Sequence, residues 1–276
     1  MSYVDSIFYS NLEEIFNEEW EVDNRAKWKD GSPVQTKRVL QVVNKYDLTK
    51  GFPILTLRDI NWKAAIDEQV IWIHSKMSNN VKDLRSKIWN SWANESGEIK
   101  QAYGFQIAKP TMGFDSQIEY VLHEIKNNPT SRRIQMNMFS AEDQLTKATE
   151  SLIECAYSTH YSVKNGKLHM TLIQRSNDFI TANNWNVTGY AALQHAIAME
   201  CDLDAGIFTH VIQDQHLYNK HLNQACELAR RFEQLEDLPL PTLEINKKPF
   251  FELTVDDFEL VGYKNHGSIE KIDVAI

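Results

Sequence analysis

The dipeptide Asn165-Gly166 separates two segments with alternating side chains, Tyr157–Val163 and Lys167–Gln174. An Asn-Gly pair between two such segments favours a two-residue turn that needs positive φ at both positions. The twist of that turn matches the twist of paired antiparallel strands. The chain therefore predicts a β-hairpin near its middle, and this is the strongest short hairpin signal that it contains.

The rest of the chain predicts strands and helices without a regular βαβ alternation, which favours an α+β fold over a doubly wound sheet. Further strands are expected at Thr36–Asn44, Ile134–Phe139 and Phe208–Ile212, with apolar alternation around Phe251 and at Phe258–Tyr263. Helices are expected around Ile7–Phe16 and at Trp62–His74, Gln117–Asn127, Val187–Cys201 and Leu217–Arg231. Repeats, low-complexity tracts and Pro/Gly linkers are absent from the sequence, so we expect a single domain over residues 1–276.

Charge and hydropathy exclude several classes of partner. A net charge of −9 argues against a general nucleic-acid-binding surface, although it allows a local basic pocket for one small anion. Apolar runs fall short of the roughly 18 residues that a membrane span needs. Residues Met1–Asn17 are acidic and amphipathic, unlike a signal peptide. We expect no nucleic acid and no membrane among the partners.

Cysteine and histidine spacing predicts neither a disulfide framework nor a metal site. The three cysteines are an odd number and widely spaced, which favours a reducing cytosol. The cysteines are Cys155, Cys201 and Cys226. Cys201 and Cys226 fall on expected core helices, where a structural role is the ordinary interpretation. The spacing of His210, His216 and His221 suits no common zinc pattern.

Three features carry candidate chemistry. Cys155 begins a strand-like segment, Arg132 and Arg133 follow a Pro-Thr-Ser sequence, and the segment 174–178 (Gln-Arg-Ser-Asn-Asp) ends another strand. Taken singly, each has an ordinary structural interpretation: a buried cysteine, solvated arginines, a polar strand end. Taken together, arginines can bind a phosphate through bidentate forks, and their positive field lowers the pKa of a nearby thiol. That combination indicates a phosphorylated substrate attacked by sulfur, and reasoning from these residue types ends there.

Ten ordered motifs resemble thymidylate synthase from end to end. They are Asp23–Lys27; Gly51–Thr56, similar to GFPLLT; Glu68–Trp72, similar to ELLWF; Ile88–Ala93, similar to IWDEWA; Ala102–Gln106, similar to VYGxQ; Asn128–Arg133, similar to DPxSRR; Arg175–Asp178, matching RSxD; Asn186, the last residue of PFN; Asp214–Tyr218, matching DxHxY; and Val274–Ile276 at the C-terminus. On these motifs the chain is identified as a member of that family over its whole length.

The resemblance implies a three-layer α+β fold, with a central mixed sheet and packed helices, in an obligate homodimer. The implied substrate is dUMP. The implied co-substrate is 5,10-methylenetetrahydrofolate, and no metal is implied. The implied location is cytoplasmic, in a bacterium or in a phage-infected host.

The resemblance also assigns roles to residues that match the motifs. Cys155 would attack C6 of the pyrimidine, Asn186 would read the O4/N3 edge, and Glu68 would organise proton transfers through water. The 5′-phosphate would be held by Arg25, Arg175 and Ser176, with Arg132 and Arg133 reaching in from the other subunit. His216 and Tyr218 would hold the ribose 3′-hydroxyl, and Tyr103 and Asp178 would orient base and pterin. Contacts to the folate would come from Trp89, Trp92, Asp178, Ala182, Ala275 and the terminal carboxylate of Ile276.

Several positions depart from the family pattern. The usual Pro-Cys-His is Glu154-Cys155-Ala156, the usual LGxPFN is Thr181–Asn186, the Asp of DQI is Ser116, and Gln213 replaces the Gly before DxHxY. In the family, the loop corresponding to Thr181–Asn186 lies against the folate. The β-carbon branch of Thr181 and the methyl of Ala182 would crowd a pterin packed there.

These departures bear on the product, because hydride transfer needs the reacting atoms within about 3.5 Å. A displaced pterin would let water take the methylene, so we expect a dUMP hydroxymethylase that makes 5-hydroxymethyl-dUMP, as in bacteriophage relatives. The alternative is a thymidylate synthase that makes dTMP and dihydrofolate, since Trp89 and Val274–Ile276 are retained. A catalytically silent nucleotide-binding homologue is a third interpretation.

Overall fold

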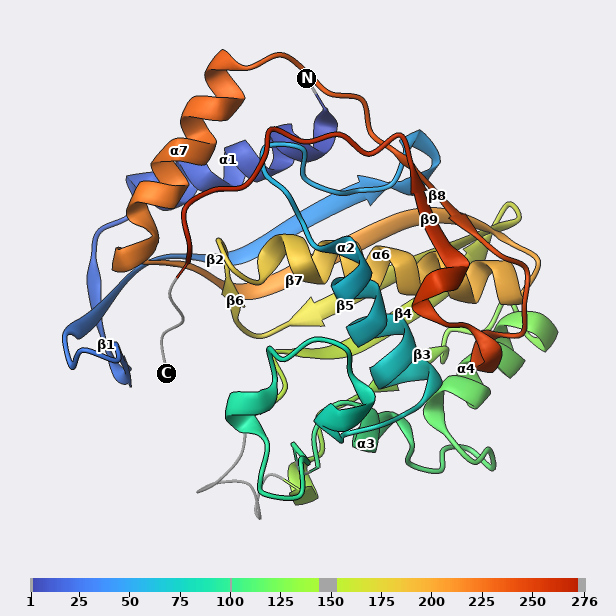
Figure 1. Cartoon of the computed structure of the whole chain (residues 1–276). Coiled ribbons are helices and arrows are strands. Elements are labelled where there is room, and N and C mark those ends of the chain that lie inside the picture. The colour runs from blue at the N-terminus through green and yellow to red at the C-terminus, as the bar shows by residue number, and fades with distance from the viewer. Residues whose placement is uncertain (1, 100, 144–152, 273–276) are drawn as a thin grey trace.

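A mixed β-sheet forms the centre of the molecule (Figure 1). This computed structural model describes residues 2–99, 101–143 and 153–272, and of residues 25–27 it describes the backbone alone. The strand order is β1-β2-β7-β5-β4-β3, and β6 also pairs with β7. The strands are β1 Glu21–Lys27, β2 Pro33–Asp47, β3 Gln135–Asn137, β4 Ala156–Lys164, β5 Lys167–Gln174, β6 Asn177–Asp178 and β7 Asp204–Tyr218. β5 and β6 run parallel to β7 and the other pairs are antiparallel, which confirms the expected mixed sheet.

The predicted hairpin joins β4 to β5. Asn165 and Gly166 have φ values of 54° and 72°, the two left-handed conformations that the turn requires. Lys164 pairs with Lys167 across the turn. The register set there brings the start of β4 beside the end of β5, so Ala156 pairs with Gln174. The turn at Asn165, ten residues from both Cys155 and Arg175 in the sequence, therefore places these two residues next to each other.

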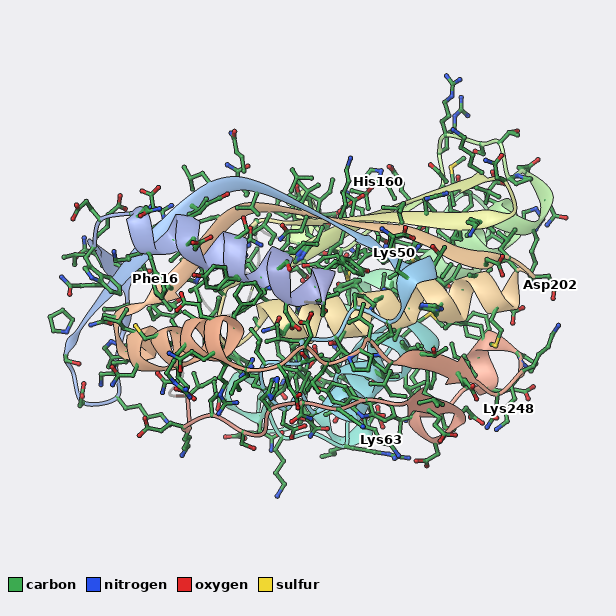
Figure 2. All side chains as sticks on the ribbon, turned by 90° about the horizontal axis from the view of Figure 1, so that it is seen from above. Phe16, Lys50, Lys63, His160, Asp202 and Lys248 are labelled. Atoms are coloured by element: carbon green, nitrogen blue, oxygen red, sulfur yellow. The ribbon has the colours of Figure 1, made fainter. Side chains whose placement is uncertain are left out.

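Helices lie on one side of this sheet. Figure 2 shows α1, α6 and α7 below the strands, whereas His160 of β4 points from the opposite side. α2 packs on α6 as an outer layer (Figure 1). The helices are α1 Tyr3–Asn17, α2 Trp62–Ile66, α3 Gly104–Ile107, α4 Gln117–Asn127, α6 Asn183–Glu200 and α7 Leu222–Gln234. A small antiparallel sheet of β8 Thr242–Ile245 and β9 Phe258–Val261 lies towards the C-terminus.

The core lies between the sheet and these helices. Ser2 caps the N-terminus of α1, and its hydroxyl accepts from the amides of Val4 and Asp5. The apolar face of α1 buries Phe8. The Phe8 ring stacks on Phe179 at a centroid distance of 4.6 Å. α6 is buried along most of its length, as expected for a central helix. Among the described helices, none is long and apolar enough to cross a membrane.

The helix predicted at Trp62–His74 is present but changes type along its length. Its first part, α2, is α-helical, and residues Asp67–Ser75 continue as a π-helix. All nine residues of the π-helical part are buried, Glu68 among them. Such wider turns are uncommon and occur frequently at functional sites.

Three predictions near the C-terminus were wrong. The expected helix Leu217–Arg231 begins only at Leu222, because pairing with β2 extends β7 to Tyr218, followed by a 3₁₀ turn over Asn219–His221. The apolar alternation around Phe251 is a 3₁₀ turn, Phe250–Glu252, and not a strand. Cys226 lies on α7 but is exposed, so it is no core cysteine.

Candidate active site

The candidate nucleophile lies where β4 begins beside the end of β5. Cys155 precedes β4, and its carbonyl accepts a hydrogen bond from the amide of Arg175 at 2.8 Å. The Arg175 guanidinium folds back over the same loop. Its Nε donates to the carbonyl of Glu154 at 3.0 Å, and its Nη2 donates to the carbonyl of Ile153 at 2.7 Å. The same Nη2 lies 3.6 Å from the Cys155 sulfur. A cation at that distance stabilises a thiolate.

Tyr103 contacts the backbone of Cys155. Its hydroxyl accepts from the amide of Cys155 at 3.2 Å, and burial raises the pKa of the phenol well above its usual value. The backbone of Tyr103 has φ 44°, a conformation that costs energy for an aromatic residue. The next residue must be glycine, since a β-carbon on Gly104 would lie 2.1 Å from the carbonyl oxygen of Ser78. This close approach fixes the position of the tyrosine.

Glu68 is a buried carboxyl group on the π-helical segment. One oxygen accepts from Trp89 Nε1 at 2.7 Å and the other from Gln69 Nε2 at 2.8 Å. Burial raises the pKa of Glu68 to about 7, and these donors oppose the rise. The indole of Trp185 also opposes it, although its Nε1 forms no hydrogen bond within the described residues. A carboxyl with a pKa near neutrality can both give and take a proton.

Aromatic rings link Glu68 to the nucleophile. The Trp89 ring meets Tyr103 edge-on at a centroid distance of 5.3 Å and lies 5.6 Å from the ring of Trp92. Trp92 is 41% exposed, so it offers an uncovered aromatic surface beside the site. The contacts run without interruption from Cys155 through Tyr103 and Trp89 to Glu68.

The expected base-reading residue, Asn186, lies in the first turn of α6. Its Oδ1 accepts from Gln174 Nε2 at 3.1 Å, and its backbone amide donates to the carbonyl of Ala182. Gln174 is the last residue of β5, directly before Arg175. The expected base-reading amide and the arginine beside the candidate nucleophile are therefore positioned by one strand end.

Asp178 and His216 meet where β6 pairs with β7. Asp178 Oδ1 accepts from the amides of Ile180 and Thr181. Burial opposes the ionisation of Asp178, but neighbouring His221, whose Nδ1 lies 3.7 Å from Oδ1, holds the pKa below its usual value. Its carboxylate is thus charged at neutral pH, at the entrance to the loop that contains Ala182.

The two expected ribose contacts stand together. His216 and Tyr218 meet edge-on at 5.0 Å, and His216 Nδ1 lies 3.3 Å from Asp214 Oδ1. Arg38 Nε donates to the other oxygen of Asp214 at 3.0 Å. Burial works against ionisation of Asp214, yet the hydrogen bonds from His216 and Arg38 lower its pKa to about 2. The negative charge of Asp214 orients the imidazole.

The expected phosphate-binding residues are only partly brought together. A cavity of about 350 Å³ is lined by Arg175 and Ser176, which follow β5, and by Arg38 from β2, and its wall also includes Asp214. The side chain of Arg25 lies outside the described residues, although its backbone is in β1, which contributes to this wall. The C-terminal residues 275–276, expected as Ala275 and Ile276 at the folate, also lie outside them.

Arg132 and Arg133 stand apart from that cavity. Both are exposed, and neither forms an ion pair with any residue that the structure describes. The Tyr120 hydroxyl binds the carbonyl of Arg133 and so fixes the backbone of the segment. Two exposed arginines that form no ion pair within the described part of the chain are compatible with the expected donation across an interface.

Sequence reasoning did not predict the contacts that three residues make with the candidate site residues. Gln174, Arg38 and His221 hold Asn186, Asp214 and Asp178, respectively. Gln174 and His221 lie close to recognised motifs in the sequence, and this position was the one sign that they could belong to the site. Arg38 lies within a plain strand pattern, and only the pairing of β2 with β7 reveals its contact.

Comparisons with known proteins agree along the whole chain. Residues 6–276 match the family model described as Thymidylate synthase. Thymidylate synthase 1 of Bacillus subtilis strain 168 is 37% identical over 289 residues, covering all of both chains. The thymidylate synthase of Bacillus phage phi3T is 36% identical with the same coverage. The solved structure of thermostable thymidylate synthase A from Bacillus subtilis is similar with a TM-score of 0.89 and 34% identity, covering 99% of each chain.

Proposed function

Because the chain belongs to the thymidylate synthase family, we propose that it converts dUMP to dTMP with 5,10-methylenetetrahydrofolate as the source of the methyl group. Enzymes of this family transfer a one-carbon unit to C5 of dUMP and use no metal. The full-length relatives, the phage relative included, are named thymidylate synthase and not hydroxymethylase. They favour methylation, the alternative above, over the hydroxymethylation expected from Thr181 and Ala182.

The observation that carries the proposal is the contact chain from Cys155 to Glu68. A thiol beside a guanidinium and a buried carboxyl with a pKa near 7 are held on one wall by Tyr103 and Trp89. The two chemical needs of the reaction are a sulfur nucleophile and a group that exchanges protons. This wall supplies both within one set of contacts.

The Cys155 thiolate adds to C6 of the pyrimidine and makes a C–S bond. The displaced electron pair moves to C5 and O4, and an enolate results. Asn186 Nδ2 donates to O4 and stabilises the charge that develops there. The Arg175 guanidinium, 3.6 Å from the sulfur, favours the thiolate form for the attack. With Ser176, which lines the same cavity, it binds the 5′-phosphate.

Glu68 serves the proton transfers, through water, that follow addition at C6. With a pKa near 7 it is present in both protonation states at neutral pH. The hydrogen bond from Trp89 holds the carboxylate in place, and the indole rings keep bulk water from it. Tyr103, which contacts the amide of Cys155, orients the loop that presents the sulfur.

The residues present fit a reduced folate beside this wall. Trp92 offers an exposed aromatic surface for a flat pterin, and the charged carboxylate of Asp178 can accept from ring N–H groups. When bound, the folate supplies the one-carbon unit and the hydride. Trp89, Trp92 and Ala182 would contact it, together with the terminal residues Ala275 and Ile276.

The family is typically homodimeric, and we propose the same for this chain. The sheet face that carries His160 has none of α1, α6 or α7 over it (Figure 2). Leu40 and Val43 of β2 are exposed by 55% and 54%. A second copy packed on the sheet would cover apolar surface of this kind, and Arg132 and Arg133 would reach the phosphate of the partner's site.

We further propose that the chain acts as one domain in the cytoplasm. The family model spans residues 6–276 without a break, which supports a single domain. Cys155, Cys201 and Cys226 form no disulfide within the described residues, which fits a reducing compartment.

The deciding experiment is product analysis after incubation with dUMP and methylenetetrahydrofolate. Formation of dTMP with an equal amount of dihydrofolate, seen as an absorbance rise, would support the proposal. Formation of 5-hydroxymethyl-dUMP and tetrahydrofolate, with no such rise, would favour the hydroxymethylase. The Cys155→Ala variant is the control for both, and a wild type with no more turnover than this variant would identify a silent homologue.

A further inference from the structure

His210 is a fully buried histidine that the proposed reaction does not use. It lies on β7 beneath the end of β5, and none of its side chain is exposed. Burial lowers its pKa to about 3, so the ring is neutral at physiological pH. Its Nε2 lies 2.7 Å from Oε1 of Gln174, whereas its buried Nδ1 has no hydrogen-bond partner among the described residues.

The backbone carbonyl of Ser176 determines which side-chain atoms donate and which accept in the hydrogen bonds of Gln174. The carbonyl oxygen of Ser176 can only accept, so the Gln174 atom that lies 2.9 Å from it must be the amide nitrogen. The same nitrogen donates to Asn186 at 3.1 Å, and Asn186 must therefore present its oxygen to Gln174. The remaining Gln174 oxygen needs a donor, and the donor is the Nε2–H of His210.

This polarity decides which end of Asn186 faces a nucleotide. With Oδ1 held by Gln174, Nδ2 is directed away as a donor, and Oδ1 keeps one lone pair. Uracil matches both atoms, since its O4 accepts and its N3–H donates. Cytosine matches neither, since its 4-amino group would meet Nδ2 and its unprotonated N3 would meet Oδ1.

We propose that His210 is a positioning residue for base selection, which through Gln174 fixes the Asn186 amide in the orientation that accepts uracil and rejects cytosine. The inference rests on the proposed function, in which Asn186 reads the base. Without the imidazole donor, Gln174 loses the contact that holds its oxygen, and the Gln174 and Asn186 amides can rotate together into the orientation that cytosine fits.

Two substitutions of His210 distinguish a role in positioning Gln174 from a role in filling the core. Glutamine at 210 can place a donor nitrogen where Nε2 lies, whereas leucine fills similar space without a donor. The readout is the ratio of dissociation constants for dCMP and dUMP, measured by titration calorimetry. His210→Leu should narrow this ratio about tenfold, the scale of one net hydrogen bond, and His210→Gln should keep it within about threefold. Affinity for 2-deoxyribose 5-phosphate, which has no base, should not change in either variant.

His195→Leu is the matched control. His195 is another neutral histidine; it is partly buried, its Nε2 has no hydrogen-bond partner among the described residues, and it lies on α6 beside Phe52. It touches neither Gln174 nor Asn186 in any described hydrogen bond, so its replacement should leave the ratio unchanged. An unchanged ratio in a folded His210→Leu protein, or the same narrowing in His195→Leu, would overturn the proposal.

A second measurement uses the unaltered protein. The nitrogen-15 spectrum of its histidine rings, with the His210 signal assigned by its loss in His210→Gln, should show the proton on Nε2. A proton on Nδ1 would contradict the network even if the leucine variant does not fold. The proposed function fails separately, if wild-type protein does not bind or turn over dUMP while the His210 proton is still on Nε2.

Discussion

The hydrogen bond from Trp89 Nε1 to Glu68 allows a quantitative test of the proton-transfer role. It is 2.7 Å long and reaches a carboxyl group that is 2% exposed. Burial has raised the pKa of Glu68 to about 7, and Trp89 is the strongest of the groups that oppose this rise. Replacing Trp89 by Phe removes the donor and keeps an aromatic ring, so the pKa of Glu68 should rise further.

The size of the change follows from the energy of a hydrogen bond to a charged group, about 1.5–3 kcal/mol. At about 1.4 kcal/mol for each pKa unit, the pKa of Glu68 would rise to about 8–9. If the charged form is the active one, about half of the wild type is active at pH 7, against about 1–10% of Trp89→Phe. The rate at pH 7 should fall about 5- to 50-fold, and most of it should return at higher pH.

The assay is release of tritium from C5-labelled dUMP, because it reports addition and proton removal without depending on the final product. Its kcat/KM is followed from about pH 5.5 to about pH 9.5, a window that brackets both pKa values. Trp92→Phe is the control, since Trp92 belongs to the same aromatic cluster and has no described hydrogen bond to Glu68. The reasoning fails if the acid limb of Trp89→Phe coincides with that of wild type, or if Trp92→Phe shifts it equally.

Three further predictions follow from the same site. In wild type, a Glu68 pKa raised from 4.5 to about 7 means that ionisation costs stability, so the free energy of unfolding should fall by about 3 kcal/mol as pH rises between these values. Glu68→Gln should lack this fall in denaturant titrations at equal protomer concentration, and an identical slope in both proteins would contradict it. Cys155→Ser should lose turnover by about 10³-fold or more yet bind dUMP in calorimetry, and near-normal turnover would refute the assignment of the nucleophile. Mixing inactive Cys155→Ala with inactive Arg132→Ala chains should restore partial activity through one intact hybrid site, and no recovery after proven subunit exchange would mean that each chain builds its site alone.

Local signals predicted the parts of the fold that depend on neighbouring residues. The Asn165-Gly166 turn fixed one hairpin and its register, and the Gln117–Asn127 helix begins and ends at the predicted residues. The hairpin alone is enough to place Cys155 beside Arg175. The prediction failed where secondary structure depends on a strand far away in the sequence. β7 continues to Tyr218 because Tyr218 pairs with Thr36 of β2, and the residues around Tyr218 do not indicate this pairing.

The candidate site could likewise be predicted only where neighbouring residues form a motif. The motifs located Cys155 and Asn186, because the proposed chemistry needs a thiol and an amide at these positions. They did not locate His210, which acts on Asn186 only through Gln174 and lies 24 residues further along the chain. The spacing of the histidines in the sequence gives no sign of the contact between His210 and Gln174. That contact arises only because β5 and β7 pair in parallel.

The altered segment Thr181–Asn186, expected to lie against the folate, also bears on Glu68 through Trp185. A carboxyl that must take a proton and return it needs a pKa near the working pH, and each donor moves that pKa down while burial moves it up. Trp89 and Gln69 supply two donors to Glu68, and Trp185, which comes from the altered loop, adds a further stabilising indole. Without Trp185 the pKa of Glu68 would be higher, and less of the carboxyl would be ionised at neutral pH. The loop that departs most from the family pattern therefore contributes to the acid–base balance of Glu68, and its sequence cannot be interpreted from contacts to the pterin alone.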